Sequence, residues 1–275
     1  MEATENRSWE HTFSDMIYWK WEGEARTSAA NVSSAVGFME RTLKLTKGAK
    51  VLDLGCARGH HSIGLASRGY DVTGLEFSDA FIEVARQNVA DAGGAVRLVH
   101  GDMTQMVFDK EFDAVILWGN TFGMFSHEDN VRTLHGIARA LRAGGLALID
   151  TQNYKGLPEK LTKTWEFHPQ DANLLFLEQG TKDVRNGRFG FDVTVLDIAT
   201  GKRHEMQFSW RLYLLPELEE MLVDAGLVLK RVYGDDPRFV DWKSWRPGEP
   251  DPYSPEGFTE NAAKRILLCR KEKNE

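Results

Sequence analysis

The segment from Val51 to Gly59, which reads Val-Leu-Asp-Leu-Gly-Cys-Ala-Arg-Gly, constrains the fold of this chain more than any other stretch. An apolar run reaches the acid Asp53, and small residues follow it at once. Glycine in a turn between a strand and a helix allows torsions that a Cβ would block, and it lets a ligand approach the backbone closely. The pattern therefore predicts a ligand-binding turn. An acid at this position favours a ligand with cationic or hydrogen-bond-donor groups over a pyrophosphate.

Residues 50 to 150 alternate short apolar runs with amphipathic stretches, which predicts a parallel sheet with helices on both faces. Ser78 is expected to open one helix. Asp129 is expected to open another, which carries Leu141 on its apolar face and stops at Gly144 and Gly145. The expected strands are Lys50 to Leu54, Asp71 to Leu75, Val96 to Val99, Phe112 to Leu117 and Leu146 to Ile149.

The pattern changes after Asp150. Residues 172 to 213 lack helical periodicity and contain the turn dipeptides Asn186-Gly187 and Thr200-Gly201, which predicts an antiparallel meander. A helix is expected over Pro216 to Ala225, and it stops at Gly226. Two further strands, at Val228 to Tyr233 and Arg265 to Cys269, complete a seven-stranded sheet. The long loop between them, residues 234–260, is rich in Pro, Asp, Gly and Trp. We interpret this loop as a lid over a substrate, with a passive surface loop as the alternative.

The composition of the chain favours some classes of binding partner over others. The chain has 275 residues, 42% of them hydrophobic, so it can bury a sizeable core. Its net charge of -7 and the absence of a basic block argue against nucleic-acid binding and favour a small-molecule substrate. No apolar run reaches the length of about 18 residues that a membrane span needs, and the N-terminus is polar, so we expect a cytoplasmic protein. Cys56 and Cys269 are expected to be buried thiols.

Further ligand-binding candidates fall at the ends of the next three expected strands, where open α/β sheets bind ligands. Glu76 lies about 20 residues beyond the glycine turn, where a carboxylate accepts the ribose hydroxyls of an adenosine cofactor. Asp102, after Gly101, is placed to accept the adenine amino group while Met103 packs on the ring. The aromatic and glycine-rich run from Leu117 to Phe125 would shape the entrance to a second pocket.

Each of these positions also has a purely structural interpretation. Gly55 and Gly59 can serve tight strand–helix packing, Glu76 can cap the following helix, and Asp102 can make a local turn. The four features do not readily coincide by chance, because each stands at the end of a different expected strand and they follow one another in order along the chain.

Residues 36–153 and 210–270 together resemble the class I S-adenosylmethionine-dependent methyltransferases, in particular the bacterial small-molecule branch with a meander inserted after the fifth strand. The resemblance implies a Rossmann-like, mostly parallel seven-stranded sheet in the order 3-2-1-4-5-7-6, with the last strand antiparallel and helices on both faces. The sequence departs from the family pattern at Ala57, where the family usually has glycine. Alanine is the smallest such change, so we expect binding to survive. The residues that carry the resemblance are the glycine turn, Glu76, Gly101-Asp102, the Asn120 to Phe125 loop and Leu141-Arg142-Ala143-Gly144-Gly145.

The resemblance implies that the cofactor is S-adenosyl-L-methionine, with S-adenosyl-L-homocysteine as its product. It implies methyl transfer to N, O or C of a small molecule such as a secondary metabolite or a sugar or amino-acid derivative. The reaction needs no metal, because the donor arrives already activated. The expected cofactor-binding residues are Asp53, Gly55, Cys56, Ala57, Gly59, Glu76, Phe77, Gly101, Asp102, Met103, Trp118 and Gly119.

The acceptor site is expected from segments outside the shared core. The aromatic segment from Phe13 to Trp21 is a candidate lid helix, with a core-packing helix as the alternative. The eight tryptophans of the chain suggest an acceptor with an apolar or aromatic body. His61, Glu178 and His204 are candidates for a catalytic base. The alternatives are a solvent-exposed helix histidine for His61 and ordinary polar residues of a half-solvated sheet for Glu178 and His204. The expected substrate-binding residues are Tyr18, Trp21, Asn120, Phe122, Phe125 and Trp210.

The expected organisation has four parts, in a protein that is a monomer or a homodimer. They are an N-terminal helical lid at 1–45, a cofactor-binding core at 46–153, the inserted meander at 154–213 as substrate cover, and a C-terminal part of the core at 214–275 that includes the loop 234–260. Three other functions were weighed. They are a catalytically silent subunit that binds S-adenosylmethionine, a nicotinamide oxidoreductase, and a nucleic-acid methyltransferase, which the acidic charge and the lack of an Asn-Pro-Pro-Tyr motif make less favourable.

Overall fold

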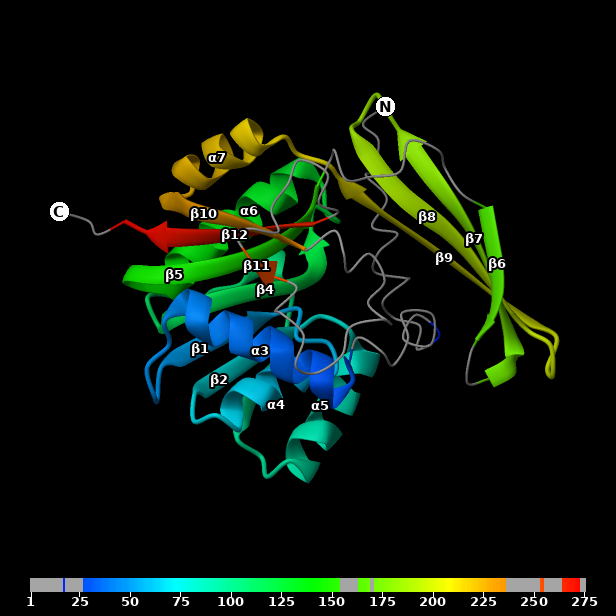
Figure 1. Cartoon of the computed structure of the whole chain (residues 1–275), viewed down its shortest axis with the longest axis horizontal. Coiled ribbons are helices and arrows are strands. Elements are labelled where there is room, and N and C mark those ends of the chain that lie inside the picture. Colours follow the sequence, from blue (N-terminus) through cyan, green and yellow to red (C-terminus); the bar gives the residue numbers. More distant parts are fainter. Residues whose placement is uncertain are drawn as a thin grey trace.

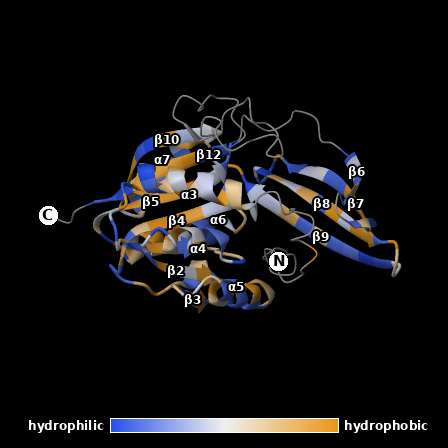
Figure 2. Cartoon of the chain, turned by 60° about the horizontal axis from the view of Figure 1, so that its bottom comes forward, coloured by the Kyte–Doolittle hydropathy of each residue, from blue (hydrophilic) through white to orange (hydrophobic). Residues whose placement is uncertain are grey.

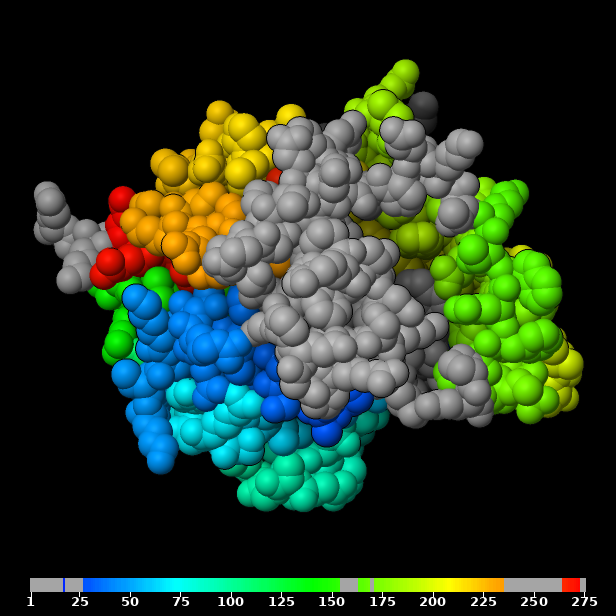
Figure 3. Space-filling model, in the orientation of Figure 1, coloured from blue at the N-terminus to red at the C-terminus, as the bar shows by residue number. Residues whose placement is uncertain are grey.

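A large mixed sheet and a smaller antiparallel sheet occupy opposite ends of the long axis of the molecule (Figures 1 and 3). The computed structural model describes residue 17 and residues 27–153, 163–168, 171–235, 253–254 and 264–272. Most of the proposed N-terminal lid, including Tyr18 and Trp21, lies outside these residues, as does most of the loop 234–260. The four-part division of the chain therefore stays a prediction.

The large sheet has eight strands in the order β11-β10-β12-β5-β4-β1-β2-β3 (Figure 1). The strands β1 to β5 pair in parallel, while β12 is antiparallel to both β5 and β10. This confirms the predicted order, to which the short β11 adds one edge strand. The bounds are β1 Lys50–Leu54, β2 Asp71–Glu76, β3 Val96–His100, β4 Phe112–Phe122, β5 Leu141–Gln152, β10 Leu227–Asp235, β11 Tyr253–Ser254 and β12 Lys264–Lys271.

Helices cover both faces of the large sheet, because alternate residues of its strands point to opposite faces and both sets are apolar. Val51 and Ile116 pack in one buried cluster with α3 and α4, whereas Leu52 and Leu117 pack in another with α6 and α7. The bounds are α3 Ala29–Leu43, α4 His60–Ala66, α5 Asp79–Asp91, η2 Met103–Gln105, α6 His127–Ala140 and α7 Leu215–Asp224. Cys56 and Cys269 are buried free thiols, as predicted.

The helix boundaries confirm one prediction and correct another. Ser78 caps α5 by accepting a hydrogen bond from the backbone of Phe81. The cap of α6 is Ser126 rather than Asp129, whose own N–H donates to the Ser126 hydroxyl at 3.0 Å. Leu141 is not helical, because it already pairs with Phe112 and starts β5.

The smaller sheet is an antiparallel meander in the order β6-β7-β8-β9, as the two turn dipeptides predicted. One of its faces is apolar and buried, and apolar residues gather on β7 and β8 as they do in the central strands of the large sheet (Figure 2). The buried side chains of this face are Leu174, Phe176, Phe189, Val193, Val195, Met206, Phe208 and Trp210. The strands are β6 Lys163–His168, β7 Asp171–Asp183, β8 Arg188–Asp197 and β9 Lys202–Arg211.

The meander is anchored to the segment that follows β4. The Arg188 guanidinium donates to the carbonyls of Met124 and Phe125 at 2.9 and 3.1 Å. The N–H of Arg211 donates to the carbonyl of Gly123 at 2.7 Å. A Cβ on Gly123 would lie 2.8 Å from the Arg211 carbonyl oxygen, closer than real Cβ contacts. Gly123 is therefore required where the two sheets meet.

We expect Gly123→Ala to weaken this junction. Gly93 gives a matched control, because both glycines have φ of 99° and a Cβ on Gly93 would meet no atom within 4 Å. The backbone strain of the two variants is similar, so Gly123→Ala should lose about 1–3 kcal/mol more, the usual cost of forcing atoms into a packed site. Urea unfolding measures the difference. Equal losses in the two variants would contradict the proposed close approach.

Candidate functional site

The turn after β1 takes three left-handed residues within five positions. Gly55, Ala57 and Gly59 have φ of 67°, 47° and 80°. The N–H groups of Gly55 and Cys56 both donate to the carbonyl of Leu75 on β2, at 2.8 and 3.0 Å. The turn is thus tied to the end of the neighbouring strand and leads directly into α4.

Gly55 keeps a space open between three elements. A Cβ at this position would lie 3.1 Å from the Met103 methyl carbon and 3.6 Å from the hydroxyl of Thr121. These residues come from the segments after β3 and β4. A side chain would therefore fill the space where the ends of β1, β3 and β4 meet, which is the place expected for a cofactor.

Asp53 is a buried carboxylate at the end of β1. Its side chain is 3% exposed, and its Oδ2 accepts a hydrogen bond of 2.6 Å from the Ser62 hydroxyl on α4. Burial raises the pKa of Asp53 to about 7, the Ser62 hydrogen bond opposes this rise, and the nearby Glu76 carboxylate adds to it. Asp53 therefore sits close to its own titration midpoint at neutral pH.

Glu76 is the second buried carboxylate and holds the glycine turn from the end of β2. Its Oε2 accepts from the N–H of Ala57 and its Oε1 from the N–H of Ser78, both at 2.8 Å. Burial raises the pKa of Glu76, while these backbone hydrogen bonds lower it. The contact with Ser78 reaches the N–H of the residue that caps α5, so the helix cap is Ser78 and Glu76 supports it from one side. Each oxygen has a second lone pair for a ligand hydroxyl.

This pair of acids fits a cationic, hydroxyl-bearing cofactor. In the described part of the chain, neither Asp53 nor Glu76 forms an ion pair with lysine or arginine, and burial disfavours the charge of both. A buried charge is stable only when it is paired and hydrogen-bonded. A ligand that brings an ammonium or sulfonium group and sugar hydroxyls would supply both kinds of partner.

In the segment after β3, the Asp102 carboxylate makes local hydrogen bonds within its own turn. The Asp102 carboxylate caps η2, with Oδ1 accepting from the N–H of Thr104 at 2.8 Å and Oδ2 from the Gln105 amide at 3.2 Å. This is the local turn weighed as an alternative, and the adenine contact stays a prediction. Met103 is buried against the core. Gly101 and Phe77 form hydrogen bonds through their backbone groups. The N–H of Gly101 donates to the Glu76 backbone carbonyl, and the Phe77 carbonyl lies within hydrogen-bond distance of the His100 ring.

The end of β4 brings together residues predicted for the cofactor and one predicted as a base. The half-buried Trp118 ring lies 6.5 Å from the His61 ring, in an edge-to-face arrangement. Burial lowers the pKa of His61 to about 4. His61 is therefore neutral near pH 7. Gly119 follows with φ of 92° and an exposed surface on which a Cβ would meet no atom.

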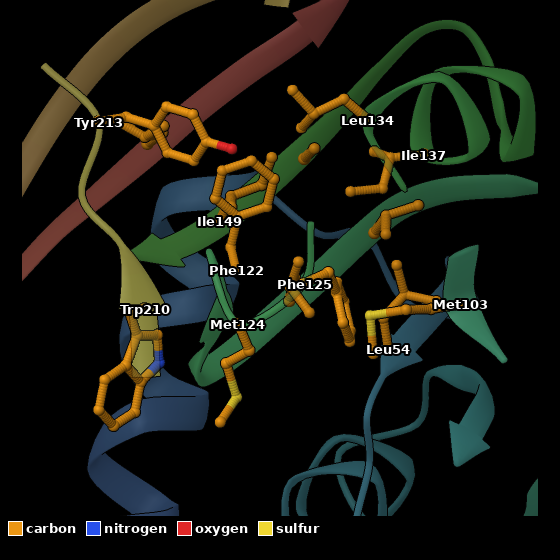
Figure 4. Packing of buried hydrophobic residues seen from close by; sticks show 14 of the residues in the cluster. Leu54, Met103, Phe122, Met124, Phe125, Leu134, Ile137, Ile149, Trp210 and Tyr213 are labelled. Atoms are coloured by element: carbon orange, nitrogen blue, oxygen red, sulfur yellow. The ribbon is translucent and has the colours of Figure 1, made fainter. Parts of the chain in front are cut away.

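Three of the predicted substrate-binding aromatic residues are buried in the core. Phe122 is 1% exposed and its ring lies 5.9 Å from that of Tyr213, and Phe125 packs in the same cluster (Figure 4). The Trp210 indole on β9 is buried and donates to the Asn120 carbonyl at 2.5 Å. These contacts give the three side chains a structural role, and their part in acceptor binding stays a prediction.

Glu178 and His204 lie on the apolar face of the meander. Glu178 stands opposite Val193 and His204 stands opposite Val195, and both valines are buried. The two polar side chains are half-buried. The structure thus places the two candidate bases on the inner face of the meander, and their role as bases stays a prediction.

Sequence reasoning missed the polar residues that support the site. Ser62 had a usable signal, since a hydroxyl on the first turns of α4 falls beside the end of β1. No sequence signal marked Asp150 and Lys264, because their pairing at 3.6 Å depends on β12 lying next to β5. Arg188 likewise depends on how the meander docks.

The comparisons with known proteins agree with this geometry. The family profile described as "Methyltransferase domain" matches residues 51–145. A demethylmenaquinone methyltransferase of Listeria welshimeri is 36% identical over 199 residues, which cover 68% of this chain and 73% of that protein. The chain belongs to the class I S-adenosylmethionine-dependent methyltransferases. The cofactor predicted from the sequence is the methyl donor of this family.

Other relatives of this methyltransferase differ in how much of their length is matched. A glycine/sarcosine N-methyltransferase of Aphanothece halophytica is 31% identical over 157 residues, 56% of this chain and 59% of that protein. The CcbJ methyltransferase of Streptomyces caelestis has the same fold over 96% of this chain and 99% of its own, with a TM-score of 0.73 at 20% identity. The sugar N-methyltransferase KedS8 of Streptoalloteichus has a TM-score of 0.59 at 17% identity, over 89% of this chain and 88% of its own.

We expect Asp53→Asn to stabilise the ligand-free methyltransferase. The pKa of Asp53 rises from 3.8 to about 7 on folding, so this carboxyl destabilises the folded state increasingly as the pH rises through that window. The variant should gain roughly 2–4 °C in Tm at pH 8, the shift that about 1 kcal/mol produces in a protein of this size, and less at pH 5. Thermal unfolding at the two pH values measures it. Asp71→Asn, at an exposed carboxyl on β2, is the control, and a gain independent of pH would contradict the account.

Proposed function

We propose that this methyltransferase transfers a methyl group from S-adenosylmethionine to an amine nitrogen of a small molecule, such as an amino sugar or an amino-acid derivative from secondary metabolism. The whole-length similarity to CcbJ supports the methyltransferase fold with the inserted meander, and the observation that carries the choice of nitrogen is the similarity to two N-methyltransferases. The names of KedS8 and of the glycine/sarcosine enzyme support nitrogen as the acceptor atom. Transfer to O or C is the alternative that the chemistry leaves open.

The cofactor supplies a methyl group on a sulfonium that is already activated for displacement. The residues of the chain therefore need to hold the cofactor, align the acceptor and exclude water, and such positioning can contribute about 7–11 kcal/mol. In the proposed site, Asp53 and Glu76 hold the cationic and hydroxyl groups of the cofactor. Gly55 leaves room for it beside Met103.

An amine acceptor must lose a proton before or after transfer. His61 is neutral near pH 7, but a group with a pKa of about 4 retains a proton poorly. Glu178 and His204 are the better candidates to receive the proton, because they lie on the meander face where we place the acceptor. The aromatic residues of that face suit an acceptor with an apolar body.

The cellular setting of this function is also a proposal. Within the described part of the chain, no helix has the length and apolar character that crossing a bilayer requires. We infer a cytoplasmic enzyme with a small-molecule substrate, without nucleic acid as a partner, acting as a monomer or a homodimer.

An acceptor screen tests the proposed function. Purified enzyme with S-adenosylmethionine and a panel of amino sugars and amino-acid amines should yield a product heavier by one CH2 group, read by mass spectrometry. Matched alcohols and phenols of the same carbon skeletons should remain unmodified. Glu76→Gln should lose turnover on every member of the panel. Methylation of the alcohols alone would replace nitrogen by oxygen as the acceptor atom.

The Ala57→Gly variant separates an active enzyme from a silent relative. The Ala57 backbone already has φ of 47° and donates to Glu76, so the turn is formed with alanine in place. Glycine removes about 1–2 kcal/mol of left-handed strain, and its greater freedom in the unfolded chain costs roughly 0.5–1 kcal/mol. We expect turnover and cofactor affinity within about threefold of the parent, a change worth only ~0.7 kcal/mol. Turnover that appears only in the glycine variant would support the silent-subunit interpretation.

A further inference from the structure

A buried charge pair lies at the same edge of the large sheet as the glycine turn. Asp150 near the end of β5 is 2% exposed and Lys264 at the start of β12 is 8% exposed. The Lys264 Nζ lies 3.6 Å from the Asp150 Oδ2. Apolar residues of similar size are often at least as stabilising as a buried pair of this kind, so its presence calls for a geometric reason.

Asp150 holds an irregular segment of β4. Its Oδ2 accepts hydrogen bonds of 3.2 Å from the backbone N–H groups of Gly119 and Asn120. Both residues are left-handed, with φ of 92° and 64°, and the register between β4 and β5 shifts between Leu117 and Phe122. We call residues 118–121 the β4 bulge. A bulge of this kind re-aims side chains and is common next to active sites.

The Asn120 side chain joins both charges to the β4 bulge. With the amide oriented to satisfy its neighbours, Nδ2 donates to the Asp150 Oδ1 at 3.2 Å and Oδ1 accepts from the Lys264 Nζ at 3.1 Å. The Asn120 carbonyl accepts from the Trp210 indole at 2.5 Å. One residue thus connects the charge pair to strand β9 of the meander.

The other side of the β4 bulge borders the cofactor turn. The Thr121 hydroxyl is 3.6 Å from the place where a Cβ on Gly55 would lie. Trp118 packs edge to face with His61, which follows the same turn. The bulge is therefore in contact with the cofactor turn on one side and with the meander on the other.

We propose that Lys264 and Asp150 are positioning residues for methyl transfer. Through Asn120 they fix the β4 bulge, and the bulge sets the position of the Trp210 indole relative to the glycine turn. Neither charged group needs to touch the acceptor. The effect on rate rests on the proposed function, whereas the effect on Trp210 is independent of it.

The hydrogen bond of the Trp210 indole gives a direct readout. The indole N–H of Trp210 gives a resonance in a ¹H–¹⁵N spectrum of the full-length protein. This resonance is identified as the one that disappears in Trp210→Phe. Lys264→Met removes the charge while keeping a long side chain, and this resonance should shift upfield as the indole bond lengthens. Lys271→Met is the matched control on the same strand, because Lys271 donates to the Leu141 carbonyl at the opposite edge of the sheet. It should leave the Trp210 resonance in place.

A second variant covers the case in which Lys264→Met leaves Asp150 unpaired and the protein does not fold. Asn120→Gly suits the left-handed backbone and keeps the Asn120 carbonyl, but it removes both side-chain links to the charge pair. The Trp210 resonance should shift in the same direction. An unchanged resonance in every folded variant, or an equal shift in Lys271→Met, would overturn the proposal.

The rate of methyl transfer gives the second readout, measured with the amine that responds best in the acceptor screen. Lys264→Met, or Asn120→Gly if that variant alone folds, should lower kcat by up to about 100-fold, the cost of a small misplacement of reacting groups. The Kd for S-adenosylhomocysteine should stay within about threefold, because hydrogen bonds to Leu75 and Glu76, and not the charge pair, hold the glycine turn in place. A loss confined to cofactor affinity would contradict the positioning role. Absence of any amine substrate would count against the proposed function while leaving the Trp210 result to decide this proposal.

Discussion

The structure depends on two carboxylates, Asp53 and Glu76, that are buried at the ends of neighbouring parallel strands and that form no ion pair with lysine or arginine in the described residues. Burial raises the pKa of both Asp53 and Glu76, and the Glu76 carboxylate raises the pKa of Asp53 further. Hydrogen bonds from the Ser62 hydroxyl and from the backbone N–H groups of Ala57 and Ser78 offset part of this rise. We infer that the fold keeps these two acids for a cationic ligand, at the expense of its own stability without that ligand.

The meander is attached to the core close to this site. The β4 bulge, the segment after it and the meander meet through backbone contacts of Gly123 and Arg211 and through side chains such as Arg188. These contacts are specific and short, so the meander is fixed relative to the core. In the proposed function, a meander fixed in this way would orient the acceptor toward the methyl group and keep water out, which is the main task that this chemistry leaves to the protein.

Much of the fold could be predicted from the sequence because its signals are local. Alternating apolar runs fixed the five parallel strands, and Asn186-Gly187 and Thr200-Gly201 marked the meander turns. The boundary of α6 was wrong because Ser126, Asp129 and Leu141 each fit a helix by propensity, and only the pairing of Leu141 with Phe112 decides where β5 begins. Tertiary contact overrode local preference there.

The site was only partly predictable for the same reason. Asp53, Gly55 and Glu76 stand at fixed spacing from one strand–turn–helix unit, so a sequence pattern can reveal them. Asp150 and Lys264 are more than 100 positions apart and meet only because β12 inserts beside β5. The burial of Phe122 and Phe125 likewise depends on α6 and Tyr213, which no local pattern specifies.

The central claim is that the two buried carboxylates bind S-adenosylmethionine rather than a dinucleotide. Calorimetric titration of the purified chain with S-adenosylmethionine, S-adenosylhomocysteine and NAD tests it most directly, with Asp53→Asn and Asp102→Ala as comparison proteins. We expect micromolar binding of the first two ligands, which is about -8 kcal/mol, no binding of NAD, and loss of S-adenosylmethionine binding in both Asp53→Asn and Asp102→Ala. Binding of NAD alone, or full affinity for S-adenosylmethionine in Asp53→Asn, would contradict it.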